Sequence, residues 1–404
     1  MPRFRKKPSL TGRIRGARPA TSSIAHAVSL ASSPRRSRTP WPRLWPGTAL
    51  PTRPTRATRS ALRSSPLPEA TEAVARRLRR QAAYCLVDGS PLYASLLEAA
   101  ADDVEADGPV RHVLAGFEQE PWSSALSLRL MGAVHRLVLE DSLPELARHY
   151  PSTGGDGDAG AAWLVFRQAL VDQRERIRAL LPRGCQTNEV GRSAALLGGF
   201  LEVAHRTGLP LRILEIGSSA GLNLRWDRYR YESDEGAWGD PYSRVRFQHS
   251  YEVPPPLNRA AEVVERKGCD LHPIDATSDE GALTLRSFVW ADQLGRLAQL
   301  DGAIEIARSM PVEVEQIDAG AFLERELAEP RHGVSTVVYH SIFMQYVGEP
   351  GRQRIDAAIE AADVFHLRME PGEDSIEVRL NDERLGTAGA HGTRVRWNVD
   401  STRT

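Results

Sequence analysis

The segment Leu211–Tyr231 reads LRILEIGSSAGLNLRWDRYRY and carries the clearest structural signal in the chain. A short, mostly apolar run ends at Glu215-Ile216-Gly217, and small residues then lead into a segment of helical composition. Such a run followed by turn residues is typical of a buried strand in a mostly parallel sheet. A glycine-bearing turn there lets backbone N–H groups approach a ligand at the carboxyl edge of the sheet. The segment therefore favours a cofactor-dependent enzyme over a scaffold.

Charge is distributed unevenly along the 404 residues. The chain holds 52 Lys or Arg and 52 Asp or Glu, but residues 1–67 hold 15 basic and no acidic residues. The remainder therefore carries a formal net charge of −15, which disfavours broad binding of nucleic acid through its phosphates.

The cysteines and the hydropathy of the chain indicate where in the cell the protein is expected. The three cysteines lie far apart without a CxxC pair, which argues against a disulfide framework and a structural zinc site. No apolar run approaches the ~20 residues that would span a bilayer. We expect a cytoplasmic protein that does not enter a membrane.

Three regions follow from composition and periodicity. Residues 1–67 are rich in Arg, Pro, Ser and Thr and are predicted to be disordered. The segment is either a functional tail that binds nucleic acid or a membrane surface, a targeting peptide, an inert extension, or the product of a misassigned start. Residues 68–208 are predicted to form a helical N-terminal subdomain. Its expected helices are Glu69–Leu86, Ser90–Asp107, Ser123–Glu140, Gly160–Leu181 and Glu189–Thr207.

Residues 209–404 alternate between strand and helix patterns, which predicts an α/β domain with a Rossmann-like, mostly parallel sheet of about seven strands. A last pair of strands is expected to close as a hairpin around the turn-rich NDERLGTAGAHG. The expected strands are Leu211–Ile216, Cys269–Ile274, Val312–Ile317, Ser335–His340, Val364–Met369, Ser375–Leu380 and Thr393–Trp397.

This order of elements resembles the sheet of class I methyltransferases. The loop EIGSSAG resembles the E-x-G-x-G-x-G loop that holds S-adenosylmethionine in that superfamily, with Ser219 in place of the middle glycine. The resemblance implies that Glu215 orders the loop or meets the amino group of the ligand. It also implies that Gly217 and Gly221 permit close approach. A tight turn that only packs a helix on the sheet is the simpler alternative.

Acidic residues close two of the later strands. Asp275 is placed to bind the ribose hydroxyls at the end of the second strand, with Asp270 as the alternative. Asp318 stands where the superfamily places a contact to the adenine amino group. Carboxylates at strand ends are also common helix N-caps, so that explanation stays open for each residue.

His340 is the first candidate for a general base, because it ends the fourth strand and an unperturbed histidine has a pKa near ~6.5. Asp227 is the second candidate proton acceptor, and Tyr346 is expected to line the same pocket. The alternative for His340 is a hydrogen-bonded structural histidine.

Two polar clusters flank the glycine loop and are predicted to bind a small polar substrate, including an anionic one. The alternative is a buried set of ion pairs that locks the helices to the sheet. Neither a metal-binding motif nor GxxxxGK[ST] is present, so no metal and no triphosphatase site are predicted. The candidate substrate-binding residues are Asn188, Glu189, Arg192, Asn223 and Arg228.

The sequence GSSAG also resembles the nucleophile elbow of α/β-hydrolases, with Ser219 at its tip. Asp318 and either His340 or His391 would complete the triad in chain order. The helical region upstream offers no strand for an oxyanion loop, which weakens this alternative.

Several blocks together resemble a bacterial family known as domain of unknown function 2332, from about residue 82 to the HGTRVRW segment. That family supplies no established activity, so the resemblance implies only a methyltransferase-like fold. The leading interpretation is S-adenosylmethionine-dependent methyl transfer. A cofactor-binding or regulatory protein that transfers nothing is the alternative. The blocks are YCLVDGSPLYASLL, QTNEVGRSA, LEIGSSAGLNLRWDRYRY, GCDLHPIDAT, VWADQLGRL and VYHSIFMQYV.

Overall fold

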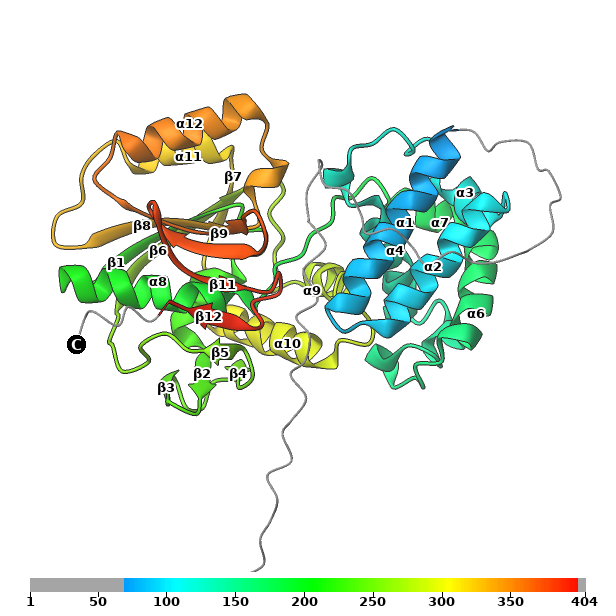
Figure 1. The fold of residues 1–404 in the computed structure, drawn as a ribbon, viewed down its shortest axis with the longest axis horizontal. Helices are drawn as coiled ribbons and strands as arrows, with labels where there is room; N and C mark the ends of the chain where they lie inside the picture. Colours follow the sequence, from blue (N-terminus) through cyan, green and yellow to red (C-terminus); the bar gives the residue numbers. More distant parts are fainter. Residues whose placement is uncertain (1–68, 399–404) are drawn as a thin grey trace, which may run out of the picture. The chain divides into compact units, whose positions relative to one another are not determined.

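A nine-stranded sheet organises the described part of the chain, residues 69–398, in the computed structural model (Figure 1). Residues 1–67, predicted to be a disordered tail, lie outside the described residues. The strand order is β5-β12-β11-β10-β9-β8-β1-β6-β7, and most neighbouring pairs are parallel. The strands are β1 (Leu211–Ile216), β5 (Tyr251–Val253), β6 (Val263–Asp270), β7 (Val314–Gln316), β8 (Ser335–Ser341), β9 (Phe365–Pro371), β10 (Ile376–Leu380), β11 (Glu383–Ala388) and β12 (Val395–Trp397).

Helices alone, with short 3-10 turns, form the described chain before β1. The helices before residue 182 build a hydrophobic cluster that also includes Trp290 and Ala291, whereas the last helix before β1 packs in a cluster on one face of the sheet. The expected helix Gly160–Leu181 is divided in two at Gln173. The helices are α1 (Glu69–Val87), α2 (Pro91–Glu105), α3 (Pro109–Leu114), α4 (Leu126–Leu139), α5 (Pro144–Ala147), α6 (Ala159–Asp172), α7 (Arg174–Leu180), α8 (Arg192–Thr207), α9 (Asp279–Ser287), α10 (Leu294–Ser309), α11 (Ala319–Glu326) and α12 (Glu349–Glu360).

The parallel strands follow the order β7-β6-β1-β8-β9, which is 3-2-1-4-5 when these five are numbered along the chain. The order reverses between β1 and β8, and open α/β sheets bind ligands in the crevice at such a point. Every residue of β1 is buried, as expected for a central parallel strand covered on both faces. The topology thus places the turn after β1 at the edge where a ligand would bind.

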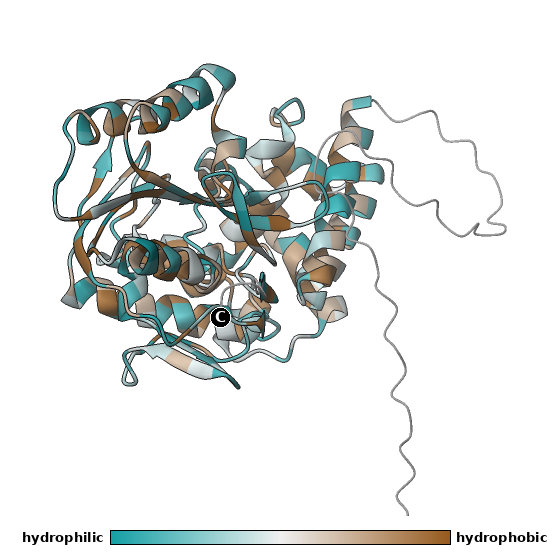
Figure 2. Ribbon diagram, turned by 60° about the vertical axis from the view of Figure 1, so that its left-hand side comes forward, coloured by the Kyte–Doolittle hydropathy of each residue, from teal (hydrophilic) through white to brown (hydrophobic). Residues whose placement is uncertain are grey.

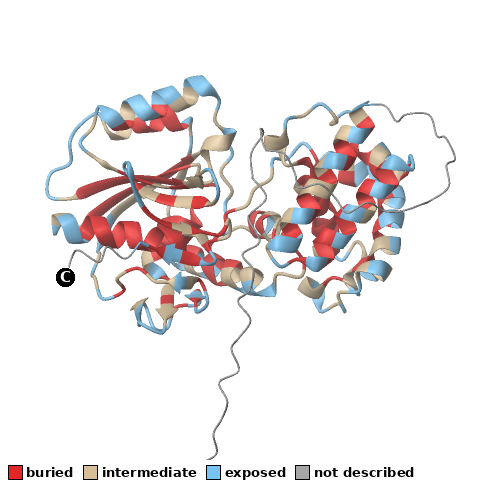
Figure 3. Ribbon diagram, in the orientation of Figure 1, coloured by how far each residue is buried: buried red, intermediate tan, exposed pale blue. Residues whose placement is uncertain are grey.

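Helices cover both faces of the sheet. Leu211 and Ile213 pack in the cluster that includes α8, whereas Leu214 and Ile216 pack with α11 and α12 on the other face. Hydrophobic residues gather on the strands and on the helix sides that pack against them (Figure 2). Helix α8 and the central strands are largely buried, while the outward side of α12 is exposed (Figure 3). The two-residue alternation of the strands therefore supplies both cores.

Two expectations about the sheet need correction. The sheet has nine strands instead of about seven. The closing hairpin is also wrong, because β11 lies inside the turn-rich segment and pairs with both β10 and β12. A Cβ at Gly386 of β11 would meet the Arg396 carbonyl oxygen at 2.5 Å. Gly386 is therefore needed because β11 and β12 approach each other closely, although the sequence alone suggests that it belongs to a turn.

The segment after the glycine loop forms a 3-10 helix, η3 (Leu222–Arg228), in place of a regular helix. Tyr229 and Tyr231 donate their hydroxyl hydrogens to the carbonyls of Leu222 and Trp226, at 2.5 and 2.8 Å. These bonds occupy carbonyls that an α-helix would use, and Arg225 has non-helical angles. A small sheet of β2 (Arg230–Ser233), β3 (Gly236–Gly239) and β4 (Arg246–Phe247) follows.

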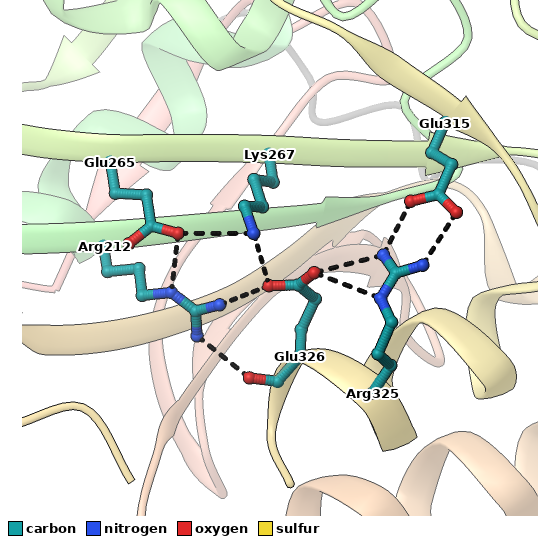
Figure 4. Close-up of polar contacts among 6 residues, drawn as sticks. All are labelled: Arg212, Glu265, Lys267, Glu315, Arg325 and Glu326. Carbon is teal, nitrogen blue, oxygen red and sulfur yellow. Dashed lines mark hydrogen bonds and ion pairs between the residues drawn. The ribbon is translucent and has the colours of Figure 1, made fainter. Parts of the chain in front are cut away.

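A charged network joins β1, β6 and β7 to α11 (Figure 4). Arg212 is 1% exposed and pairs with Glu326 at 2.5 Å and Glu265 at 3.2 Å. Lys267 contacts the same two carboxylates, and Arg325 joins Glu326 to Glu315. Each buried charge thus has an opposite charge beside it, which offsets the cost of desolvation.

Candidate functional site

A cavity of about 810 Å³ opens at the carboxyl ends of β1, β6, β7 and β8. Gly217, Ser219 and Asp270 line it from the sheet, and Arg129 and Cys185 line it from the segments before the sheet. The cavity lies where the strand order reverses, and its volume is in the range of ligand sites, about 300–1,000 Å³. It is the candidate site.

The glycine loop has three residues in the left-handed region: Gly217, Ser219 and Gly221, with φ of 67°, 53° and 65°. A Cβ at Gly217 would lie 2.1 Å from the Phe343 ring, so that ring covers the glycine inside the cavity. A Cβ at Gly221 would lie 2.7 Å from Val314, and Gly221 does not line the cavity. Gly221 therefore packs closely on β7, and its contact with a ligand stays a prediction.

Asp270, the last residue of β6, links the second strand to the glycine loop. Its carboxylate accepts hydrogen bonds from the backbone N–H groups of Ser219 and His272, both at 2.9 Å. The expected residue, Asp275, lies outside the cavity and accepts from Thr277 in the turn before α9. Because β6 ends at residue 270, the structure moves the strand-end carboxylate from Asp275 to Asp270.

Two further acidic residues were expected to contact the cofactor. Asp318 lines the cavity, caps α11 by accepting from Ala321 at 3.1 Å, and contacts Arg354 at 3.2 Å. Glu215 is 2% exposed and does not line the cavity. Burial raises the pKa of Glu215 to about 8. Glu215 therefore lies beneath the loop, and its contact with a ligand stays a prediction.

His340, the first candidate for a general base, does not line the cavity. It is fully buried, with Nδ1 2.7 Å from Glu370 Oε1 and Nε2 3.0 Å from His366 Nε2. Glu370 Oε1 also accepts from the backbone N–H groups of Phe343 and Met344. His340 therefore belongs to a buried network that holds the loop after β8.

Asp227 also lies outside the cavity lining. Both of its carboxylate oxygens accept hydrogen bonds from Arg266, at 2.6 and 3.1 Å, and Arg228 approaches it at 3.3 Å. This paired carboxylate fixes η3 to β6. The roles of Asp227 as a base and of Arg228 as a substrate contact stay predictions, and neither residue lines the cavity.

Of the expected substrate residues, Arg192 and Tyr346 line the cavity. Asn188 accepts from the N–H of Leu222 at 2.7 Å, and Asn223 accepts from the Ser193 hydroxyl at 2.7 Å. Glu189 is 7% exposed and pairs with Arg296. Asn188, Glu189 and Asn223 therefore hold the segments around the glycine loop, as the ion-pair alternative expects.

Sequence reasoning missed several residues of the cavity wall. Arg129 is a buried residue of the mostly apolar helix α4, and nothing in the sequence links it to the sheet. Phe343 and Ile342 follow β8, and Ile342 has a φ of 50°. A β-branched residue in this region is strained, a feature that clusters at functional sites.

Other candidate features are weaker. A second cavity of about 610 Å³ is lined by Lys267, Arg325 and Glu326, whose charges are paired with one another (Figure 4). Within residues 69–398 there is no group of three or more His, Cys, Asp or Glu that could hold a metal ion. No helix in the same range is long and apolar enough to cross a membrane.

Sequence comparison gives the family. Residues 75–397 match the family described as "Uncharacterized protein conserved in bacteria (DUF2332)", and the chain belongs to it. No curated protein and no solved structure matches the chain.

Proposed function

We propose that this protein is an S-adenosylmethionine-dependent methyltransferase for a small polar molecule, with a methyltransferase-type, Rossmann-like sheet. One observation carries the proposal: the loop after β1 and the carboxylate that ends β6 meet in a large cavity at the reversal of strand order. Action on a small molecule in the cytoplasm, without broad nucleic-acid binding, is part of the same proposal.

The residues of the cavity fit a cofactor that carries a nucleoside. Asp270 uses its two oxygens for two backbone bonds, and each carboxylate oxygen can accept another bond from a ribose hydroxyl. Leu271 and Ile317 add apolar surface beside it. Gly217 and the Phe343 ring, which lie against each other, both line the cavity. When bound, S-adenosylmethionine supplies an electrophilic methyl group.

The chain's contribution to catalysis would be positioning. Cys185 lines the cavity, and burial raises the pKa of its thiol to about 12, so the thiol is protonated at neutral pH. Tyr346 also lines the cavity and is an exposed side chain. Methyl transfer to an acceptor that is already nucleophilic needs only alignment of the two reactants.

The hydrolase alternative gains no support from the geometry of Ser219. Its hydroxyl donates to Gln186 Oε1 at 2.8 Å, and no histidine among residues 69–398 hydrogen-bonds to it. His340 and His391 contact Glu370 and Glu189 instead. A fluorophosphonate probe that labels wild-type protein but not Ser219→Ala would restore this alternative.

The test is calorimetric titration of the full chain with S-adenosylmethionine and S-adenosylhomocysteine. We expect micromolar affinity, about −8 kcal/mol, for the wild type. Asp270→Ala should weaken binding by at least about tenfold because the ribose acceptor is lost. Asp275→Ala, a carboxylate five residues on and outside the cavity, should bind like the wild type.

If neither nucleoside binds the folded wild-type protein, the proposal is overturned. It is also overturned if Asp270→Ala and Asp275→Ala lose affinity equally. Binding without loss of the methyl group in the presence of any extract fraction would favour the non-catalytic alternative.

A further inference from the structure

We propose that the cavity contains an anion subsite centred on Arg192, which binds a carboxylate or phosphate group of the methyl acceptor. Assigning the anion to an acceptor rests on the proposed methyl transfer. The subsite itself rests only on the surroundings of Arg192.

Arg192 lines the cavity from the first turn of α8. Its Nε donates to the Ala390 carbonyl at 3.2 Å and Nη1 donates to the Ser341 carbonyl at 3.0 Å. A guanidinium has five N–H donors, so these bonds fix its position and leave donors on Nη1 and Nη2. In the described part of the chain, no Asp or Glu forms an ion pair with Arg192.

The other charged groups of the cavity are already engaged. Arg129 pairs with Glu120 at 2.5 Å and donates to the Leu181 carbonyl. Asp270 accepts from two backbone N–H groups, and Asp318 contacts Arg354. Among the arginines that line the cavity within residues 69–398, Arg192 is therefore the one without a carboxylate partner.

Two neighbouring features favour an oxyanion. The Cys185 thiol of the cavity wall lies in the electrostatic field of Arg129, Arg192 and Arg296. Ser124 also lines the cavity, beside Arg129, and its buried hydroxyl oxygen has no hydrogen-bond partner in the described residues. A free hydroxyl on the cavity wall can donate to an anion bound in the cavity.

The desolvation cost of the Arg192 charge also favours an anionic ligand. Burial lowers the pKa of Arg192, so keeping its charge away from water costs free energy that the nearby Glu189 and Glu370 offset only in part. An oxyanion that accepts from Nη1 and Nη2 offsets this cost through charge-assisted hydrogen bonds. A neutral acceptor would leave the cost in place.

The position of Arg192 favours the acceptor over the cofactor. Arg192 is held by Ser341 at the end of β8, whereas Asp270 ends β6. The order β6-β1-β8 places these strands on opposite sides of β1. Arg192 and the proposed ribose contact therefore come from different sides of the glycine loop.

The experiment uses the full chain and three variants: Arg192→Gln, Arg192→Lys and Arg244→Gln. Arg244 is a matched control, because its side chain is 74% exposed and pairs with Glu305 outside the cavity. Inorganic phosphate, benzoate and the neutral benzamide are titrated by calorimetry at constant ionic strength. Thermal unfolding without added anion confirms that each variant is folded.

We expect the wild type to bind phosphate, benzoate or both, and to bind benzamide at least about tenfold more weakly than benzoate if benzoate binds. Arg192→Gln should lose anion binding by a similar factor. Arg192→Lys should keep part of it, because the charge remains but the planar fork is lost. Arg244→Gln should behave like the wild type. The preferred anion distinguishes a phosphate-bearing from a carboxylate-bearing acceptor.

Equal anion affinity in the wild type and Arg192→Gln, or no anion binding by either, would overturn the subsite. The cofactor's own carboxylate is tested with S-adenosylhomocysteine and methylthioadenosine, which lacks the amino-acid part. If Arg192→Gln weakens only the former, Arg192 holds the cofactor and the acceptor assignment is overturned. If neither nucleoside binds the wild type while anion binding depends on Arg192, the proposed function fails and the subsite stands.

Discussion

Glu215 combines deep burial with a carboxyl oxygen that has no hydrogen-bond partner among residues 69–398. It stands opposite Tyr339 in the register of β1 and β8, and the Tyr339 hydroxyl also lacks a partner in this range. Burial raises the pKa of Glu215 to about 8, and the neighbouring Tyr339 offsets this only in part. A protonated carboxyl at neutral pH is therefore the expected form beneath the glycine loop.

The substitution Glu215→Gln tests this protonation state. In the unfolded chain this carboxyl titrates near 4.5, so between pH 4.5 and 8 the folded state holds the extra proton. Wild-type stability should fall as pH rises through this window, by up to about 1.4 kcal/mol per pH unit. Glu215→Gln should lack this decline, as measured by denaturant unfolding at pH 5 to 9.

Glu313→Gln serves as the control because Glu313 is exposed. Parallel pH profiles for the wild type and Glu215→Gln would show that Glu215 is ionised in the folded protein throughout.

Strands with a mostly apolar sequence could be located from the sequence almost to the residue. The expected Leu211–Ile216 coincides with β1, and the expected Ser335–His340 differs from β8 by one residue. The second strand could not be located in this way, because β6 reads VVERKGCD. Its Arg266 and Lys267 are charged but paired, with Asp227 and Glu326 respectively. Ion pairs with residues distant in the sequence produce no apolar pattern along the strand, so the strand could not be located from the sequence.

The loop after β8 depends on a carboxylate from the neighbouring strand β9. Glu370 accepts from His340 Nδ1, the Phe343 N–H and the Met344 N–H, at 2.7, 2.8 and 3.3 Å. Glu370→Ala should lower the unfolding free energy by about 1.5–3 kcal/mol, because these donors lose a charged acceptor. Amide hydrogen exchange at Phe343 and Met344 should become faster.

Glu370→Gln, which keeps an acceptor oxygen, should recover part of the stability. Glu373→Ala removes an exposed carboxylate three residues away and should have little effect. Unchanged exchange at Phe343 in Glu370→Ala would show that the loop is held by other contacts.

The cavity wall is assembled from segments far apart in the chain, and this limits what sequence could predict. The carboxyl edge of a parallel sheet follows from strand order, so Gly217, Ser219 and Asp318 could be predicted to lie there, and all three line the cavity. Which side chains point into the cavity could not be predicted. Successive residues of a strand face opposite sides, so an error of one residue in the position of the strand reverses every direction. His340 points into the core while Ser341 lines the cavity. Arg129, from helix α4, has no sequence signal that links it to the sheet.

A buried ion cluster ties the helices to the segments around the glycine loop. Glu189 Oε2 accepts from Arg296 Nε at 2.9 Å and from His391 Nδ1 at 3.0 Å. His391 also approaches Asp88, which follows α1 and contacts Arg394. Burial acts to raise the pKa of Glu189, but Arg296 and His391 lower it well below its usual range. The carboxylate therefore stays ionised in the folded protein.

Glu189→Gln should be strongly destabilising, by about 3–5 kcal/mol, since it leaves Arg296 buried without its carboxylate. Glu305→Gln breaks the exposed pair with Arg244 and should cost less than about 1 kcal/mol. Because the folded-state pKa of Glu189 is depressed, its contribution is present above pH 4.5 and is lost as pH falls below that value. The stability difference between the wild type and Glu189→Gln should therefore narrow in acid, as followed by denaturant unfolding. A difference independent of pH would mean that the variant acts through packing and not through charge.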